Sequence, residues 1–219
     1  MSSLSHGEAV EPRPLLRGVL HEIGLGVALV VGTLLIVGAD GGKPSVAAAV
    51  FAGSVALCLA LSTLYHRVTW RPRARLWMRR MDHAGVFVLI AGTYTAVGLL
   101  SLHGVLQMTV LPIVWTGAAL AVLAKVVWVH SPKWVSVVLG VALGWVGIVA
   151  LPQLMDTAGP AAVALLAAGG VAYTLGAVVY GTKRPNPSPR WFGFHEIFHA
   201  LTVVGFTCHY VAAALAVLR

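Results

Sequence analysis

The chain has 219 residues, of which 58% are hydrophobic and only 10% are charged, and its formal net charge is +8. Its mean hydropathy is +0.87. These values exclude a soluble domain, because the surface of such a domain would need far more charged side chains. The composition therefore predicts a protein that crosses the membrane several times.

Apolar runs of about 20 residues, the length of helix that crosses a bilayer core, recur along the chain. Seven such runs predict an all-α fold of seven transmembrane helices, at residues 19–39, 45–66, 82–102, 106–128, 134–151, 160–181 and 194–217. A tail of residues 1–18 precedes one transmembrane domain, residues 19–219, and no separate soluble domain fits. Glu8 and Glu11 in the tail argue against a signal peptide.

The basic residues predict the orientation in the membrane. Of the 15 Lys and Arg residues, all but Lys43 and Arg219 lie in the tail or in alternate loops. The richest of these loops, residues 67–81, contains Arg67, Arg71, Arg73, Arg75, Arg79 and Arg80. By the positive-inside rule, the N-terminus is cytoplasmic and the C-terminus lies outside. We expect this charge to attract anionic lipids of the inner leaflet, and we expect no nucleic-acid partner.

Small residues and prolines inside the apolar runs have structural interpretations. Gly140 and Gly144 form a small-x-x-x-small pattern that is typical of close helix packing. Pro112 is interpreted as a tolerated kink, and Pro152 as the end of a helix.

Two polar motifs stand out in this apolar sequence. The last predicted helix begins with His195-Glu196-Ile197-Phe198-His199, which places two imidazoles on one helix face with the spacing of a zinc-binding motif. Ser62 and His66 have the same spacing at the end of the second predicted helix, and Asp82 begins the third. Because the helices alternate in direction, we expect all of these side chains to lie at the level of the cytoplasmic leaflet.

Three neutral histidines and a water molecule make a zinc site that stays open to substrate. Zinc lowers the pKa of its bound water to about 7 and so generates a nucleophile near neutral pH. Asp82 is our candidate for the carboxylate that holds this water and takes its proton, and Ser62 for a supporting hydrogen-bonding group. The sequence therefore predicts a zinc centre formed by His66, His195 and His199.

Each of these residues also has a simpler interpretation. A single histidine such as His66 at a helix end is often an interfacial residue, Asp82 could cap its helix, and Ser62 could bond a backbone carbonyl. Glu196 opens another alternative, since the HExxH pattern is also that of zinc peptidases in which this glutamate is the general base. The position of the motif in the last helix argues against a peptidase.

Three segments carry a family resemblance: Ser62-Thr63-Leu64-Tyr65-His66, then Arg80-Met81-Asp82-His83 with Ala91-Gly92-Thr93-Tyr94-Thr95, and finally Trp191-Phe192-Gly193-Phe194-His195-Glu196-Ile197-Phe198-His199. In these segments the sequence resembles the hemolysin III family, part of the progestin and adipoQ receptor family of seven-helix membrane proteins. The resemblance covers most of the chain.

The resemblance implies a zinc ion held by His66, His195 and His199, with Asp82 contacting a metal-bound water. It also implies an integral protein of a bacterial plasma membrane with a cytoplasmic N-terminus. Relatives include adiponectin receptors and alkaline ceramidases, which suggests hydrolysis of a lipid amide.

Other polar residues receive no role in the predicted site. His21 and Glu22 begin the first helix and could reach the site, but an interfacial anchor and a helix-start acid are the favoured interpretations. His209 lies ten residues beyond His199, or roughly 15 Å along the helix, and is too far away to share the metal. His83 points about 100° away from Asp82 on a helix, and His103 and His130 look like loop or interface residues.

Three classes of function are consistent with these observations. The leading hypothesis is a zinc-dependent hydrolase of a membrane lipid amide. The others are a receptor or regulatory protein with a structural zinc, and a transporter or pore, which the apolar outer halves of the helices disfavour. The sequence predicts neither the substrate nor the oligomeric state, and imidazole ligands also accept other transition metals.

Overall fold

The computed structural model describes residues 14–128 and 131–219. Within these ranges, seven helical segments are long and apolar enough to cross a membrane, as the sequence predicted. The elements are α1 (Val19–Val37), α2 (Gly42–Arg67), α3 (Pro72–Ser101), α4 (Gly104–Val127), α5 (Lys133–Gly144), η1 (Val146–Ala150), α6 (Leu151–Thr157), α7 (Pro160–Thr182) and α8 (Phe194–Val217). The fifth membrane segment comprises α5, η1 and α6 together.

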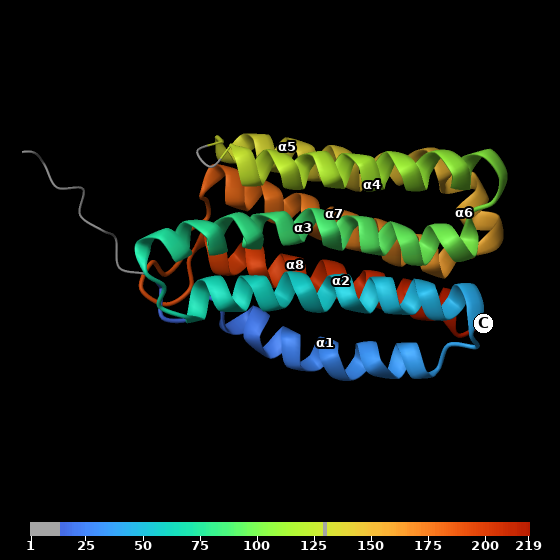
Figure 1. Cartoon of the computed structure of the whole chain (residues 1–219), viewed down its shortest axis with the longest axis horizontal. Coiled ribbons are helices and arrows are strands. Elements are labelled where there is room, and N and C mark those ends of the chain that lie inside the picture. Colours follow the sequence, from blue (N-terminus) through green and yellow to red (C-terminus); the bar gives the residue numbers. More distant parts are fainter. Residues whose placement is uncertain (1–13, 129–130) are drawn as a thin grey trace, which may run out of the picture.

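The helices run side by side along the long axis of the molecule (Figure 1). One buried apolar cluster lies between α1, α2, α3 and α8, and a second lies between α3, α4, the fifth segment and α7. Helix α3 contributes to both clusters. In its most apolar stretch of 18 residues, 67% of the residues are buried, against 11% in the corresponding stretch of the fifth segment. Helix α3 is therefore the central helix, and the fifth segment is the least buried of the seven.

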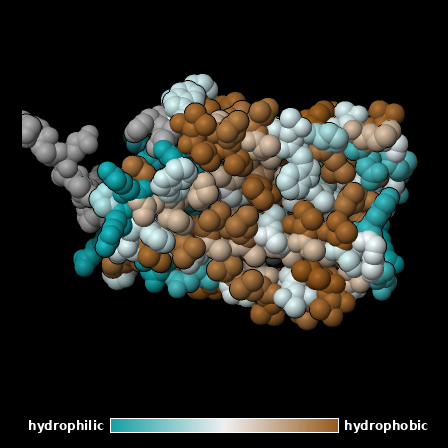
Figure 2. Space-filling model, in the orientation of Figure 1, coloured by the Kyte–Doolittle hydropathy of each residue, from teal (hydrophilic) through white to brown (hydrophobic). Residues whose placement is uncertain are grey.

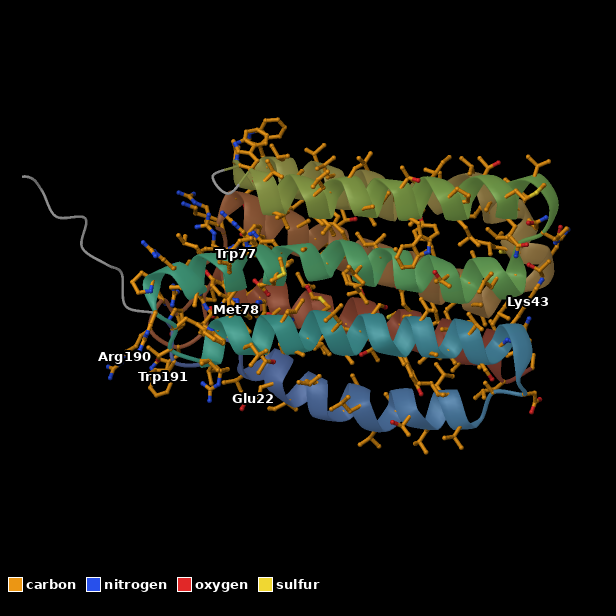
Figure 3. The ribbon with its side chains drawn as sticks, in the orientation of Figure 1. Glu22, Lys43, Trp77, Met78, Arg190 and Trp191 are labelled. Atoms are coloured by element: carbon orange, nitrogen blue, oxygen red, sulfur yellow. The ribbon has the colours of Figure 1, made fainter. Side chains whose placement is uncertain are left out.

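The surface of the molecule has the polarity expected of a membrane protein. Figure 2 shows hydrophobic side chains over the middle of the visible face and hydrophilic side chains gathered at both ends. Arg190 and Trp191 lie at one end of the bundle and Lys43 lies at the other (Figure 3). We call the end that carries Arg190 and the arginines of residues 67–80 the basic end. Helices α1 and α8 begin there, and α2 ends there.

Helix α3 begins earlier than predicted. It starts at Pro72 rather than at residue 82, so most of the predicted loop 67–81 is helical. Proline suits the first turn of a helix, and the Arg, Ala, Leu and Met residues that follow it are good helix formers. Because the N-cap of α3 is Arg71 and Asp82 lies well inside the helix, the capping interpretation of Asp82 is wrong.

The fifth segment also differs from the prediction, because it changes helix type instead of ending at Pro152. Helix α5 ends at Gly144, the 3-10 turn η1 follows, and Pro152 lies in the first turn of α6. The prediction that Pro152 terminates the span is wrong, since a proline at this position gives up no helical hydrogen bond. Pro112 lies inside α4, as expected.

Gly140 and Gly144 do not pack against another helix. A Cβ atom at either position would meet no atom within 4 Å, so the predicted packing role is wrong. Instead both glycines line a cavity. The break in the helix is tied to α3 by Tyr94, whose hydroxyl donates to Gly144 O at 2.7 Å and accepts from Gly147 N at 2.6 Å.

Helices α2 and α3 are in close contact at Gly92, so we expect a larger side chain there to destabilise the protein. A Cβ atom on Gly92 would lie 2.5 Å from Ser54 Cβ and 3.3 Å from Val50 O. We expect Gly92→Ala to destabilise the protein by about 1–3 kcal/mol, because neither helix can move away without disturbing the core. The measurement is the thermal midpoint of unfolding in detergent.

Gly53→Ala on α2 is the matched control, since a Cβ atom there would meet nothing within 4 Å. This change should leave the midpoint unchanged or raise it, because alanine favours a helix by about 0.5–1 kcal/mol over glycine. Equal midpoints for the two variants would contradict the close approach of α2 and α3.

The orientation in the membrane stays a prediction and can be checked with a reporter enzyme that needs disulfide bonds. Such a reporter is active only outside the cytoplasm. We expect activity from fusions after Lys43 and after Arg219, and none from a fusion after Trp70. The reverse pattern would place the basic end outside.

Candidate metal centre

Three histidines from two distant parts of the chain meet at the basic end of the bundle. His66 lies in the last turn of α2, and His195 and His199 lie in the first two turns of α8. One ring nitrogen from each lies within 4.8 Å of the others, and the Nε2 atoms of His66 and His195 are 3.1 Å apart. The structure thus brings together the three residues that the spacing singled out, in a group that could hold a metal ion.

The segment before α1 helps to hold α2 and α8 together. Gly18 has a φ of 82°, and a Cβ atom there would lie 2.7 Å from His66 Cβ, so only glycine fits between α1 and the end of α2. The neighbouring Arg17 forms an ion pair with Glu196 on α8. The start of α1 therefore contacts both helices that carry the histidines.

Glu196 is engaged in this structural role. Its side chain is 1% exposed, and its carboxylate accepts hydrogen bonds from Arg17 and, at 2.8 Å, from the backbone N–H of Gly193. The second contact caps the first turn of α8. Glu196 is also absent from the described residues that line the cavity inside the bundle, the one that Gly140 and Gly144 line. This arrangement argues against Glu196 as a general base and so against the peptidase interpretation.

Asp82 and Ser62 lie beside the histidines, as their spacing suggested. Asp82 Oδ2 is 3.9 Å from His66 Nε2, and these two side chains are 12% and 6% exposed. Ser62 lies within hydrogen-bonding reach of the Asp82 carboxylate, and its hydroxyl is 2.7 Å from His21 Nδ1. A separation of 3.9 Å is too long for a direct hydrogen bond but is within the range of an ion pair, so the Asp82 carboxylate lies close to His66.

His21 is the residue that sequence reasoning misjudged. It is buried, and its ring stacks on that of His199 with the centroids 3.8 Å apart and the planes 4° apart. The interpretation of His21 as an interfacial anchor is therefore wrong. Glu22, one residue on, does lie at the surface, where its carboxylate accepts a hydrogen bond from Arg67 at 2.7 Å.

A signal for the burial of His21 was present in the sequence. His21 shares one face of α1 with four other buried residues, Gly24, Ala28, Gly32 and Leu35. Their spacing of three or four residues is that of a single helix face, and small residues on such a face allow helices to approach closely.

The site opens into a cavity of about 170 Å³ inside the bundle. Its wall is mostly apolar and comes largely from α3, α5, α7 and α8, while His21, Ser62, Asp82, His195 and His199 supply polar groups. A second cavity of about 120 Å³ adjoins it and shares Tyr94, Trp145 and His209 among its lining residues. The two cavities together extend from the histidines along the bundle.

The donor set suits a transition metal. Neutral imidazoles are ligands for Zn²⁺ and related ions, and zinc–nitrogen distances of about 2.0–2.1 Å in tetrahedral geometry place the ligand nitrogens roughly 3.3 Å apart. The nitrogens of His66, His195 and His199, with 3.1 Å between one pair and none beyond 4.8 Å, need only small side-chain rotations to reach that geometry.

Comparison with known proteins supports a single family. Residues 10–210 match the family described as Haemolysin-III related. The chain is 33% identical to Hemolysin-3 of Bacillus cereus over 162 residues, which are 72% of this chain and 74% of the relative. It is also 33% identical to the Hemolysin-3 homolog of Bacillus subtilis (strain 168) over 146 residues, which are 66% of this chain and 68% of that relative.

These matches and the membrane-spanning helices agree on the class of protein. The relatives come from bacteria, and the described part of the chain contains seven segments able to cross a membrane. The protein is thus an integral protein of the bacterial plasma membrane. The chain belongs to the haemolysin-III related family.

Proposed function

We propose that the protein is a zinc-dependent hydrolase of a membrane lipid amide, acting at the level of the cytoplasmic leaflet. The observation that carries this proposal is the position of the histidine group at one end of a largely apolar cavity within the bundle. Such a cavity suits an acyl chain, and its polar end suits the group to be cleaved. A purely structural zinc site would need no cavity beside it.

His66, His195 and His199 would hold the metal. When bound, a zinc ion supplies Lewis acidity, which polarises a carbonyl group and makes water a stronger acid. The lining residues position the acyl chain and exclude bulk water from its scissile end. The choice of an amide rests on the alkaline ceramidases, which are among the relatives of the family that the sequence resembles.

Asp82 is the residue that moves the proton. Its carboxylate is close to His66 and is 12% exposed, so it can take a proton from an attacking water at Oδ2 and return it to the leaving amine. Ser62, between His21 and Asp82, orients this carboxylate by hydrogen bonding. His21 fixes the Ser62 hydroxyl and supports the ring of His199 from one face.

Metal content tests the ligand set. We expect purified protein to contain about one equivalent of zinc, as in mononuclear catalytic sites. His66→Ala and His195→Ala should each lose most of it, because two imidazoles bind the ion far more weakly than three. The measurement is elemental analysis, with circular dichroism to verify that the variants keep their helices.

His103→Ala is the control for this experiment, since His103 is exposed between α3 and α4, where its ring bonds Gln153. It should retain the metal. Full metal content in either His66→Ala or His195→Ala would contradict a centre shared by α2 and α8.

Carboxylate variants test the mechanism. Asp82→Asn should keep its zinc but lower kcat for a lipid amide by about 10²–10⁴-fold, the usual contribution of a general base. Glu196→Gln should have a milder effect on kcat and should mainly lower the thermal midpoint, since it weakens a buried ion pair. Both variants are compared with wild type for kcat, zinc content and thermal midpoint.

The opposite ranking of the two variants would favour a peptidase-like mechanism with Glu196 as the base. A wild-type protein that binds zinc, unfolds when the zinc is removed and never cleaves an amide lipid would favour a structural zinc in a receptor or regulatory protein.

A further inference from the structure

Two aromatic residues face the cavity well away from the histidine group. Tyr173 on α7 and His209 on α8 both line the main cavity, and their ring centroids are 5.3 Å apart. His209 also lines the adjoining cavity. Since it follows His199 by ten residues on one continuous helix, it lies about 15 Å farther along the bundle.

Glycines on both helices make room for these rings. A Cβ atom on Gly169 of α7 would lie 2.5 Å from His209 Nε2, and a Cβ atom on Gly205 of α8 would lie 2.7 Å from Tyr173 Cζ. Each helix thus lacks a side chain where the ring of the other lies. The two rings are held in place by this reciprocal fit.

Both rings carry a buried polar atom without a partner among the described residues, namely Nδ1 of His209 and the hydroxyl of Tyr173. His209 Nε2 is 3.1 Å from Leu166 O, and because a carbonyl only accepts, Nε2 carries the proton. In the neutral ring Nδ1 is then an acceptor, while the Tyr173 hydroxyl is a donor. Unpaired buried groups of this kind are rare in native proteins and call for an explanation.

Two threonine hydroxyls that line the same cavity do not provide that explanation. Thr93 donates to Leu89 O at 3.0 Å and Thr202 donates to Phe198 O at 2.9 Å, each within its own helix. Their protons are therefore not available to Nδ1 of His209.

We propose that His209 and Tyr173 form a second polar subsite, which binds a hydroxyl group carried partway along the acyl chain of the ligand. A hydroxyl matches the pair, because it donates to Nδ1 of His209 and accepts from the hydroxyl of Tyr173. The position of the amide at the histidine group rests on the proposed function. The subsite selects for chains hydroxylated roughly 15 Å from the amide, since a plain chain leaves both polar groups unpaired.

Binding of matched lipid probes tests the subsite without turnover. The probes are ketone analogues of a long-chain amide, in which a methylene replaces the amide nitrogen so that they are not hydrolysed. One bears a hydroxyl on carbon 12, one bears it on carbon 2 and one has none. Their dissociation constants are measured on the detergent-solubilised, zinc-loaded protein by displacement of a fluorescent lipid. We expect the carbon-12 probe to bind about tenfold more tightly than the other two.

Tyr173→Phe removes only the hydroxyl of Tyr173. It should weaken this preference, because His209 alone then bonds the hydroxyl of the ligand, and the plain probe should bind at least as tightly as it does to the wild type. Tyr180→Phe is the matched control, because Tyr180 lines the same cavity on the same helix but lies beside His195, with the ring centroids 5.8 Å apart. It should keep the preference for the carbon-12 probe.

Two outcomes would overturn the subsite. One is a wild-type protein that binds all three probes equally or binds none, which would mean that the pair holds only water. The other is a Tyr173→Phe variant that prefers the carbon-12 probe as strongly as the wild type does. A clear preference in a protein that cleaves no amide would leave the subsite standing and remove the hydrolase proposal.

Discussion

Polar side chains inside a bilayer must find their partners within the protein, because no water is at hand to bond them. This constraint organises the basic end of the bundle. Four histidines, Asp82 and Ser62 gather there in contact with one another, and the Arg17–Glu196 ion pair secures the helix start from which two of the histidines project.

The same constraint explains why the N-terminal segment matters to the site. Arg17 neutralises a buried carboxylate, Gly18 permits contact with His66, and His21 covers one face of His199. Helix α1 is otherwise mostly exposed, with only 28% of its most apolar window buried. Its beginning therefore contributes more to the candidate metal centre than to the core.

The sequence was enough to predict much of the fold and the centre of the site. Spans follow from hydropathy because each must be about 20 apolar residues long, and the three metal-binding candidates follow from helical spacing combined with alternating direction. The early start of α3 was missed because the arginines after Pro72 read as a loop by hydropathy, although they favour helix. The roles of Gly140, Gly144 and Pro152 were missed because a break between α5 and α6 depends on contacts with Tyr94, which no local pattern encodes.

The roles of His21 and Glu196 depend on which way a side chain points at a helix start, and there local composition is a poor guide. Both positions hold a polar residue in a first turn, yet both side chains are buried. Neighbouring Glu22 is exposed because it lies about 100° around the helix. On α1, the spacing of Gly24, Ala28 and Gly32 marks the face that another helix covers. This spacing distinguishes buried His21 from exposed Glu22 better than residue type does.

Helix α8 carries polar residues at helical spacing along most of its length. His195, His199, Thr202 and His209 follow one another at helical spacing, and all four line the main cavity. A helix advances about 1.5 Å per residue without bending much over two or three turns, so this face fixes the distance between the metal centre and the deeper polar pair. The close contacts at Gly169 and Gly205 hold α7 against α8 and so keep Tyr173 beside His209. The proposed subsite would therefore select a lipid chain by the distance of its polar group from the histidines, since one helix carries both sites.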